Sequence, residues 1–403
     1  MIALNKIVQA KKQVTSIVDN TPFAKAPLLS EMVGAEVYLK KENLQITGAY
    51  KIRGAYNKIA SLSEDERERG VIAASAGNHA QGVAYSAKVF KARAVIVMPE
   101  ATPLLKVSGT KDLGAEVILH GDNYDEAYAH AQHISKEEGL VFIHPFEDEV
   151  VIAGQGTVAL EMLDAVDDLD FIIVPIGGGG LISGVSSAIK QIDPKIKVIG
   201  VTAKGAPAMY ESFRAKCVIH SKSVRSIADG IAVRDTSAKN LIHILECVDE
   251  IVQVDDEEIA TAILFLLERQ KLVVEGGGAA GVAALMHHKF DFAPNSKIGI
   301  ILSGGNIDVQ TLSVIIEKGL IKSARKMIIT VTLVDKPGAL MRLTDILREA
   351  NANIIKIDYD RTSTTLSYGD ANITITLETK GEAHQNEVRQ KLKEGDYGFS
   401  EAF

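Results

Sequence analysis

Short runs of apolar, mostly β-branched residues alternate with amphipathic segments between residues 70 and 320 of this 403-residue chain. Two of the runs, F-I-I-V-P-I at 171–176 and I-G-I-I-L at 298–302, are apolar at every position, as strands covered on both faces are. Such alternation favours parallel sheets with helices on both sides, and therefore an α/β fold. The predicted strands are 70–74, 94–98, 116–119, 140–143, 170–175, 197–201 and 297–302.

The pattern changes near residue 325, which indicates a second domain. Residues 327–334 alternate between apolar and polar side chains, as a strand with one wet face does. The predicted elements are that strand, a helix from Pro337 to about Ala350, strands at 354–359 and 371–378, a helix at 383–394 and a short closing strand. We therefore predict an α+β domain at 327–403, joined by a linker at 323–326 to a domain at 1–322.

The composition excludes several classes of protein. The apolar content of 46% and the charged content of 24% are those of a soluble globular chain. A net charge of −8 without a basic stripe gives no support for nucleic-acid binding. Cys217 and Cys247 form no CxxC motif, and no apolar run reaches the roughly 18 residues of a membrane helix. Since the N-terminal apolar stretch is also too short for a signal peptide, we expect a cytoplasmic protein without a membrane segment.

Four consecutive glycines, Gly177 to Gly180, follow the strand at 171–176 and precede a predicted helix from Leu181 to Ile192. Backbone without side chains at a helix N-terminus presents several N–H groups and the positive end of the helix dipole to an anion. The segment is neither a GxGxxG motif nor a P-loop. We interpret it as a phosphate site, and a glycine-rich tight turn is the alternative.

A second turn, Ser75-Ala76-Gly77-Asn78-His79, follows the strand at 70–74. Its small residues leave backbone N–H groups open to a carboxylate, and Asn78 offers an amide donor. The alternative is that Asn78 only caps a helix that begins near Ala80. His79 at the start of a helix is more often structural than catalytic.

Lys51 is the candidate reactive residue. It lies in the glycine-flanked segment G-A-Y-K-I-R-G at 48–54, just after a predicted strand at 37–40. An amine that is shielded from water loses part of its preference for the charged form, and a neutral amine attacks carbonyl groups. Ser303 begins the S-G-G-N segment at 303–306, at a strand end where ligands of α/β sheets bind, although an ordinary polar turn is the alternative.

Together these segments resemble the serine/threonine dehydratases (threonine ammonia-lyases), which are fold-type II pyridoxal-phosphate enzymes related to the tryptophan synthase β subunit. The similarity is carried, in order, by residues 40–54, 75–82, 177–181 and 303–306. It implies pyridoxal 5′-phosphate as cofactor and a catalytic domain at 1–322. It also implies that a smaller subdomain at about 45–150 is inserted in a larger one.

The resemblance assigns roles to the residues that hold the cofactor. Lys51 would form the Schiff base and then move the Cα proton of the substrate. Asn78 would bond the 3-oxygen of the ring, Ser303 would lie at the ring nitrogen, and Glu275 would lie close to the ring. The phosphate would be held by Gly177, Gly178, Gly179, Gly180 and Leu181.

The resemblance also assigns the substrate carboxylate to the turn after the first predicted strand. The residues that would receive it are Ser75, Ala76, Gly77, Asn78 and His79, with Ser75 also among the catalytic candidates. The serine racemases of this family carry serine at the position of Ala76, where it protonates the opposite face of the substrate. Alanine has no proton to give, which disfavours racemisation as the main activity.

The implied activity is that of a carbon–oxygen lyase, converting L-threonine to 2-oxobutanoate and ammonia by α,β-elimination, and also L-serine to pyruvate. An L-serine dehydratase or a serine racemase-like enzyme is the alternative, as is a non-catalytic amino-acid sensor, against which Lys51 argues. Isoleucine biosynthesis and threonine breakdown both remain open as pathways. Some relatives hold a cation near residues 225–235, where Asp229 could contribute an oxygen, but a surface or capping aspartate is the simpler interpretation and we predict no metal.

Residues 327–403 resemble an ACT domain, an α+β ferredoxin-like fold, through the order of their elements and the D-K-P-G-A-L turn at 335–340. Such domains often bind an amino acid between two copies, which would involve Asp335, Gly338, Asn351 and Asn353. A plain dimerisation module is the alternative. We predict regulation by a small effector, an amino acid or a nucleotide, and a homodimer or homotetramer.

Overall fold

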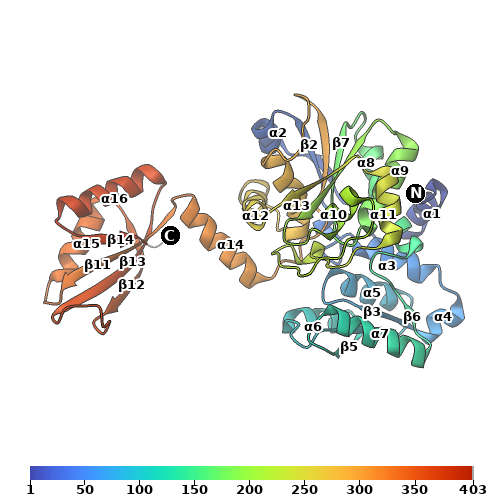
Figure 1. Cartoon of the computed structure of the whole chain (residues 1–403), viewed down its shortest axis with the longest axis horizontal. Helices are drawn as coiled ribbons and strands as arrows, with labels where there is room; N and C mark the ends of the chain where they lie inside the picture. Colours follow the sequence, from blue (N-terminus) through green and yellow to red (C-terminus); the bar gives the residue numbers. More distant parts are fainter. Residues whose placement is uncertain (402–403) are drawn as a thin grey trace. The chain divides into compact units, whose positions relative to one another are not determined.

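The computed structural model describes residues 1–401, which form two compact units that divide between Asp308 and Val309 (Figure 1). The division lies before the predicted linker at 323–326, because helix α14 (Val309–Lys322) groups with the second unit. Residues 402 and 403, the end of the predicted second domain, lie outside the described residues. Within 1–401, no helix is both long enough and apolar enough to span a membrane.

The first unit is built on a six-stranded sheet that is parallel except for its first edge strand. The strand order is β1 (Phe23–Lys25), β2 (Glu36–Lys40), β10 (Lys297–Ile301), β7 (Phe171–Pro175), β8 (Lys197–Ala203) and β9 (Glu250–Val254). Every residue of β7 is buried, as its continuous apolar sequence predicts. The predicted α/β fold with parallel sheets is confirmed.

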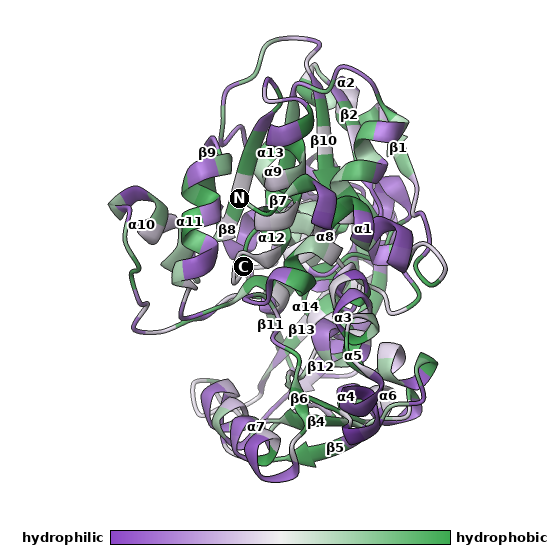
Figure 2. Ribbon diagram, turned by 90° about the vertical axis from the view of Figure 1, so that its right-hand side faces the viewer, coloured by the Kyte–Doolittle hydropathy of each residue, from purple (hydrophilic) through white to green (hydrophobic). Residues whose placement is uncertain are grey.

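A second, four-stranded parallel sheet lies entirely between β2 and β7 in the sequence. Its order is β5 (Glu116–Leu119), β4 (Ala94–Met98), β3 (Val71–Ala74) and β6 (Val141–Phe142). The segment that carries it is therefore an insertion into the larger sheet's chain. Figure 2 shows the strands of both sheets mainly in the hydrophobic colour, and helices with polar outer faces cover them.

Helices fill the connections of both sheets in the first unit. They are α1 (Leu4–Val14), α2 (Pro27–Val33), α3 (Lys51–Ala60), α4 (Glu64–Arg69), α5 (Asn78–Val89), α6 (Leu104–Asp112), α7 (Tyr124–Glu138), α8 (Glu149–Ala165), α9 (Gly180–Ile192), α10 (Ala208–Ala215), α11 (Ala238–Cys247), α12 (Asp256–Gln270) and α13 (Gly276–Met286), with 3₁₀ turns η1 (Glu42–Leu44) and η2 (Asp229–Ile231). The sequence patterns miss β1 and β9. Both are edge strands, and β1 has only three residues, so neither forms the long apolar run that marks a central strand.

A buried ion cluster surrounds Arg53 on α3, the helix that begins with Lys51. The guanidinium of Arg53 donates to both carboxylate oxygens of Glu42 (2.7 and 2.8 Å) and to both oxygens of Glu161 (2.7 and 2.8 Å). Lys40 donates to Glu161 at 2.5 Å, and the side chains of Lys40, Glu42 and Arg53 have no exposed surface. The cluster connects β2, η1, α3 and α8, so it holds the helix that carries Lys51 against the larger sheet.

The second unit follows the predicted β-α-β-β-α-β order. After α14 come β11 (Lys326–Val334), α15 (Ala339–Glu349), β12 (Asn353–Asp360), β13 (Asp370–Glu378), α16 (Glu382–Glu394) and β14 (Phe399–Glu401). The antiparallel sheet has the order β12-β13-β11-β14. Alternate residues such as Ile329 and Ile373 are buried against Leu343 on α15 and Val388 on α16, and together they form a separate core.

Candidate active site

A cavity of about 1010 Å³ opens at the carboxyl ends of the parallel strands in the first unit. Chain segments that follow β3 and β6 of the smaller sheet and β7 and β10 of the larger sheet all contribute to its lining, because the carboxyl ends of the parallel strands of both sheets border it. The predicted site residues of the first unit line it: Lys51, Ser75, Ala76, Gly77, Asn78, His79, Gly177, Gly178, Gly179, Gly180, Leu181, Glu275 and Ser303. Residues that are 252 positions apart in the sequence thus share one cavity.

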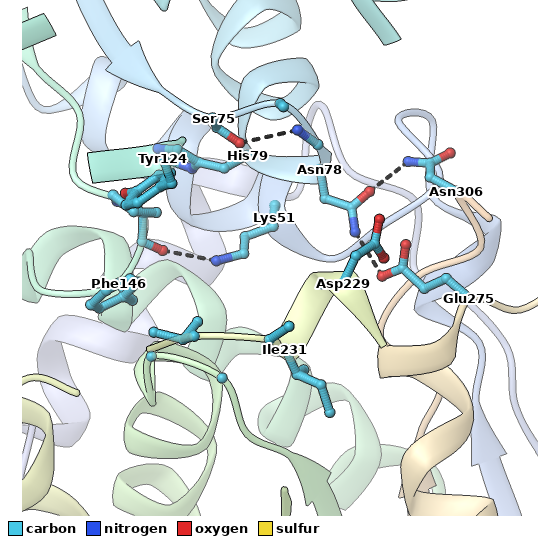
Figure 3. Close-up of a pocket in the computed structure, with 18 of the residues that line it drawn as sticks. Lys51, Ser75, Asn78, His79, Tyr124, Phe146, Asp229, Ile231, Glu275 and Asn306 are labelled. Carbon is cyan, nitrogen blue, oxygen red and sulfur yellow. Dashed lines mark hydrogen bonds between the residues drawn. The ribbon is translucent and has the colours of Figure 1, made fainter. Parts of the chain in front are cut away.

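Lys51 is the first residue of α3 and extends into this cavity (Figure 3). Its Nζ donates to the backbone carbonyl of Pro145 at 2.9 Å. Burial lowers the pKa of Lys51 to about 8, and the negative charge of Glu275 acts in the opposite direction. The amine is therefore closer to its neutral, nucleophilic form at physiological pH than an exposed lysine is.

The four glycines form a cradle at the N-terminus of α9. A Cβ on Gly178 would lie 2.4 Å from the ring of Phe146, and one on Gly180 would lie 3.0 Å from the Phe146 backbone. Gly179 has φ of +89°, a backbone conformation that other residues rarely adopt. The backbone therefore approaches Phe146 too closely for any side chain, and the first N–H groups of the helix are left for an anion.

The structure contradicts the interpretation that Asn78 in the turn at 75–79 caps the following helix. Asn78 is the first residue of α5 and not its cap, since the N-cap position belongs to Gly77 and no side chain caps this helix. The backbone N–H of Gly77 donates to the hydroxyl of Ser75 at 3.2 Å. Since the side-chain amide of Asn78 caps no backbone group of the helix, it can form hydrogen bonds within the cavity.

His79 is structural, as its position at a helix start suggests. Its Nε2 lies 2.8 Å from the carbonyl of Ile143, which can only accept, so Nε2 carries the hydrogen. Burial lowers the pKa of His79 to about 3, and the charge of Lys51 lowers it further. The imidazole is therefore neutral and held by its hydrogen bond to Ile143. The part of His79 that remains for the cavity is its backbone.

Asn78 and Glu275 meet directly in the cavity (Figure 3). The Nδ2 of Asn78 donates to Oε1 of Glu275 at 2.7 Å, and the Oδ1 of Asn78 accepts from Nδ2 of Asn306 at 2.7 Å. Burial raises the pKa of Glu275 to about 7, the nearby carboxylate of Asp229 raises it further, and the hydrogen bond from Asn78 lowers it. Glu275 is therefore a carboxyl group that changes charge near neutral pH.

Ser303 is 3% exposed and lines the cavity from the end of β10. Its carbonyl accepts from the backbone N–H of Tyr50 at 3.1 Å, and Ala49 forms a backbone bridge to Gly304. The segment that precedes Lys51 is thus held against the S-G-G-N turn, which fixes where α3 begins.

Asp229 lies on η2 at the cavity and pairs with Lys106 of α6 at 2.9 Å. Lys106 belongs to the inserted segment and Asp229 to the larger part of the unit. Among residues 1–401, no three His, Cys, Asp or Glu side chains gather as metal ligands would. The carboxylate of Asp229 therefore serves in an ion pair in this structure.

Phe146 and Asn306 also shape the cavity, yet neither is a candidate from the sequence. Phe146 lies against Gly178 and Gly180, and its carbonyl accepts from Asn240 at 2.8 Å. Its position three residues after the predicted strand at 140–143, where a strand ends, is the one signal that could have marked it. Asn306 belongs to the quoted S-G-G-N segment, but its contacts depend on how distant segments meet.

The effector candidates of the second unit do not form one site within a single chain. Asp335 follows β11 and accepts from Tyr359 at 2.7 Å, and it pairs with Arg361 at 3.0 Å. Asn353 lies opposite Glu378, the residue that also faces Lys326 at the start of β11. Gly338, at the N-terminus of α15, is near Asp335 in the chain, whereas Asn351 precedes β12 at the other end. A site that uses all four residues therefore needs a second copy of the chain.

Comparisons with known proteins reveal relatives over nearly the whole chain. Residues 14–304 match the family profile described as pyridoxal-phosphate dependent enzyme. An L-threonine ammonia-lyase of Thermotoga maritima is 49% identical over 392 residues, which are 97% of each chain. An L-threonine ammonia-lyase of Geobacter sulfurreducens is 45% identical over 393 residues, which are 98% of each chain.

Solved structures share the fold of the first unit. The processed form of threonine deaminase isoform 2 from Solanum lycopersicum has a TM-score of 0.75 at 37% identity, covering 78% of this chain and 86% of that one. Maize serine racemase also has a TM-score of 0.75 at 37% identity, covering 80% of this chain and 99% of that one. The same fold thus occurs in a threonine deaminase and in a serine racemase, and the cavity residues must distinguish the two activities.

Proposed function

Because the chain belongs to the family of pyridoxal-phosphate dependent enzymes, we propose that it is an L-threonine ammonia-lyase, which converts L-threonine to 2-oxobutanoate and ammonia. The observation that carries the proposal is the position of Lys51. Its buried amine shares one cavity with the glycine cradle and with the turn at 75–79. An amine nucleophile, an anion site and a carboxylate-sized turn are what this reaction requires.

The residues of the cavity fit pyridoxal 5′-phosphate. The glycine cradle lies at a helix N-terminus and would hold the phosphate together with Leu181, the residue that follows it on α9. Lys51 supplies the amine that the cofactor aldehyde requires. Ser303 offers a neutral hydroxyl, and Asn78 an amide donor, for the ring. When bound, the cofactor supplies an electron sink that stabilises the negative charge left at Cα after deprotonation.

Lys51 also has the properties of a base for the α-proton. With a pKa of about 8, roughly a tenth of its amine is neutral at pH 7, against fewer than about one in a thousand for an ordinary lysine. A base whose pKa lies near the working pH is the most effective one. The backbone of the Ser75–His79 turn would orient the substrate carboxylate, so that the α-proton of the substrate faces Lys51.

We propose L-serine as a second substrate, since the two substrates differ by one methyl group and a pocket discriminates by only about 1–3 kcal/mol on that basis. The proposal disfavours racemisation because Ala76 lines the cavity without a proton to exchange. The relatives named L-threonine ammonia-lyase support threonine as the main substrate.

The test uses the purified full-length protein loaded with pyridoxal phosphate. We expect L-threonine to yield 2-oxobutanoate and ammonia in equal amounts, and L-serine to yield pyruvate, as measured by oxo-acid derivatisation and chiral chromatography. Formation of D-serine as the main product from L-serine would instead identify a racemase. Cofactor binding without turnover of either amino acid would leave a sensor, and the lyase proposal would be wrong.

The lowered pKa of Lys51 predicts how pH controls cofactor uptake. The amine attacks the cofactor aldehyde only when it is neutral, so the rate of reconstitution of the apoenzyme should rise with pH and level off above about 8. Replacing Glu275 by glutamine removes a negative charge that raises the Lys51 pKa, and should therefore move the midpoint to lower pH. Stopped-flow absorbance measures both curves. A rate that still rises above pH 10 in the wild type would contradict the prediction.

The glycine cradle predicts a steric effect on cofactor affinity. A Cβ at Gly178 would overlap the ring of Phe146. Overpacking of this kind costs about 1–3 kcal/mol, because side chains and backbone must shift to accommodate the added atoms. We expect Gly178→Ala to weaken pyridoxal phosphate binding about tenfold or more, as measured by equilibrium titration. The double variant Gly178→Ala/Phe146→Ala removes the overlap and should recover part of the affinity. Unchanged affinity in the single variant would contradict the close contact.

We further propose that the second unit is an ACT-like regulatory domain and that the protein acts as a homodimer or homotetramer. The β-α-β-β-α-β order of its elements supports this, and Asp335 and Asn353 would be brought together only by a second copy. Isoleucine, valine, threonine, serine and AMP are the effectors to titrate by calorimetry. Heat of binding that disappears in Gly338→Val, with catalysis retained, supports the proposal, whereas a strictly monomeric protein would contradict it.

We also propose a cytoplasmic location. Cys217 and Cys247 are both free thiols, which suits a reducing compartment. Cell fractionation tests this. The choice between a role in isoleucine biosynthesis and one in threonine breakdown follows from which effector binds, because an inhibitory end product marks a biosynthetic enzyme.

A further inference from the structure

Asn306 makes hydrogen bonds to two segments beside the cavity through a single amide group. Its Nδ2 donates to the carbonyl of Thr47 at 2.8 Å and to Oδ1 of Asn78 at 2.7 Å, while Oε1 of Gln81 lies at the limit of hydrogen bonding, 3.5 Å away. Thr47 precedes the helix of Lys51, and Asn78 begins α5. The amide therefore connects the end of β10 with both of these elements (Figure 3).

The direction of these bonds is determined by the carbonyl of Thr47. A backbone carbonyl can only accept, so the part of the Asn306 amide that faces it must be the NH₂ group. The same NH₂ group faces Asn78, and the Asn78 atom that meets it must therefore be the oxygen. It follows that the NH₂ group of Asn78 faces Glu275 and the cavity.

The space around Asn306 keeps this amide in place. A Cβ at Gly48 would lie 2.5 Å from Oδ1 of Asn306, and Gly48 has φ of +70°. The N–H of Gly305 donates to the carbonyl of Gly48 at 2.8 Å. The loop before Lys51 thus packs directly on Asn306, which leaves the side chain little freedom to turn.

We propose that Asn306 is a positioning residue, which fixes the amide of Asn78 so that Asn78 presents a hydrogen-bond donor, and not an acceptor, to the cofactor ring. The inference rests on the proposed function, because the donor matters only if a ring oxygen is bound there. Asn306 itself needs no contact with the cofactor. Its role is to prevent a half-turn of the Asn78 amide, which changes the shape of the side chain very little but reverses its polarity.

Two substitutions distinguish this role from simple packing. Asn306→Asp keeps the shape but can only accept at neutral pH, so it should attract the NH₂ group of Asn78 and reverse the network. Asn306→Ala removes this contact and leaves the Asn78 amide held only by its hydrogen bond to Glu275. We expect pyridoxal phosphate to bind about tenfold or more weakly in Asn306→Asp than in the wild type, with a smaller loss in Asn306→Ala. The visible absorption band of the bound cofactor should shift in the same order.

A packing role predicts the opposite order, because aspartate fills the space of asparagine and alanine leaves a hole. Equal binding by the aspartate variant and the wild type, or weaker binding by the alanine variant than by the aspartate variant, would overturn the proposal. Lys58→Ala is the control, since Lys58 pairs with Asp148 outside the cavity lining, and it should bind the cofactor as the wild type does. Circular dichroism establishes that each variant is folded.

A failure of the Asn306 proposal can be distinguished from a failure of the lyase proposal. If the wild type binds the cofactor but releases no oxo acid from threonine, the lyase proposal fails, and the order of the two Asn306 variants in the binding titration still decides the role of Asn306. If the wild type binds no pyridoxal phosphate, both proposals are overturned.

Discussion

Replacing Lys51 by alanine is expected to lower kcat with L-threonine by about a thousandfold or more, because the proposed function assigns to this one amine both the attachment of the cofactor and the transfer of the α-proton. The glycine cradle is untouched by the substitution, so the variant should still bind pyridoxal phosphate by its phosphate group. Borohydride reduction should fix the cofactor covalently in the wild type alone. Oxo-acid release and mass spectrometry of the reduced protein measure the two effects.

Lys58→Ala is the matched control for Lys51→Ala. Lys58 lies on the same helix and pairs with Asp148 at 2.7 Å, outside the cavity lining. We expect it to retain the activity and the covalent label. Full turnover by Lys51→Ala, or a reduced cofactor attached to another lysine, would contradict the assignment of the catalytic amine.

Replacing Arg53 by methionine is expected to have the largest effect on stability. The substitution leaves the carboxylates of Glu42 and Glu161 buried with only Lys40 to balance them. Breaking a buried ion pair in this way costs about 3–5 kcal/mol, because a charge remains in a medium that does not solvate it. Urea unfolding of the holoenzyme, followed by cofactor absorbance and circular dichroism, should show a transition of the first unit at clearly lower urea.

Arg93→Met provides the comparison for Arg53→Met. Arg93 pairs with Glu116 and Glu138, but its side chain is 46% exposed, and exposed pairs are worth at most about 1 kcal/mol. Arg53→Lys tests geometry, since lysine keeps the charge but not the four hydrogen bonds that the guanidinium donates to the two carboxylates. Equal unfolding midpoints for Arg53→Met and Arg93→Met would show that the cluster does not hold the unit together.

Much of the fold could be predicted because it depends on local patterns. The β7 strand is buried on both faces and therefore apolar throughout, and the helix from Asp256 to Gln270 begins with the capping box that Asp255 and Glu258 predict. Strands β11 and β13 of the second unit show alternation with period two, because only one face of each is buried in the core. Edge strands β1 and β9 carry no such pattern, because only one side of an edge strand is covered by the sheet.

The chemically decisive residues of the site were also open to prediction. Lys51, the glycines at 177–180 and the turn at 75–79 are marked by residue type and by their place after a strand. Each segment follows a parallel strand, the turn in the smaller sheet and the other two in the larger sheet, and in the structure all of them line one cavity. Their placement could be predicted because it requires no knowledge of side-chain contacts.

The sequence by itself determined the parallel architecture, and it marked Lys51 and the glycines at 177–180 as the candidate amine and anion site, since each is a property of one segment. Only the tertiary structure decided that Asn78 starts a helix and bonds to Glu275 and Asn306, that Arg53 lies in a buried cluster with Glu42 and Glu161, and that Asp335 and Asn353 lie at opposite ends of a sheet. The physical reason is that the effect of a hydrogen-bonding group or a buried charge depends on its partner, which a local sequence pattern does not identify. Such partners here are up to 228 residues away.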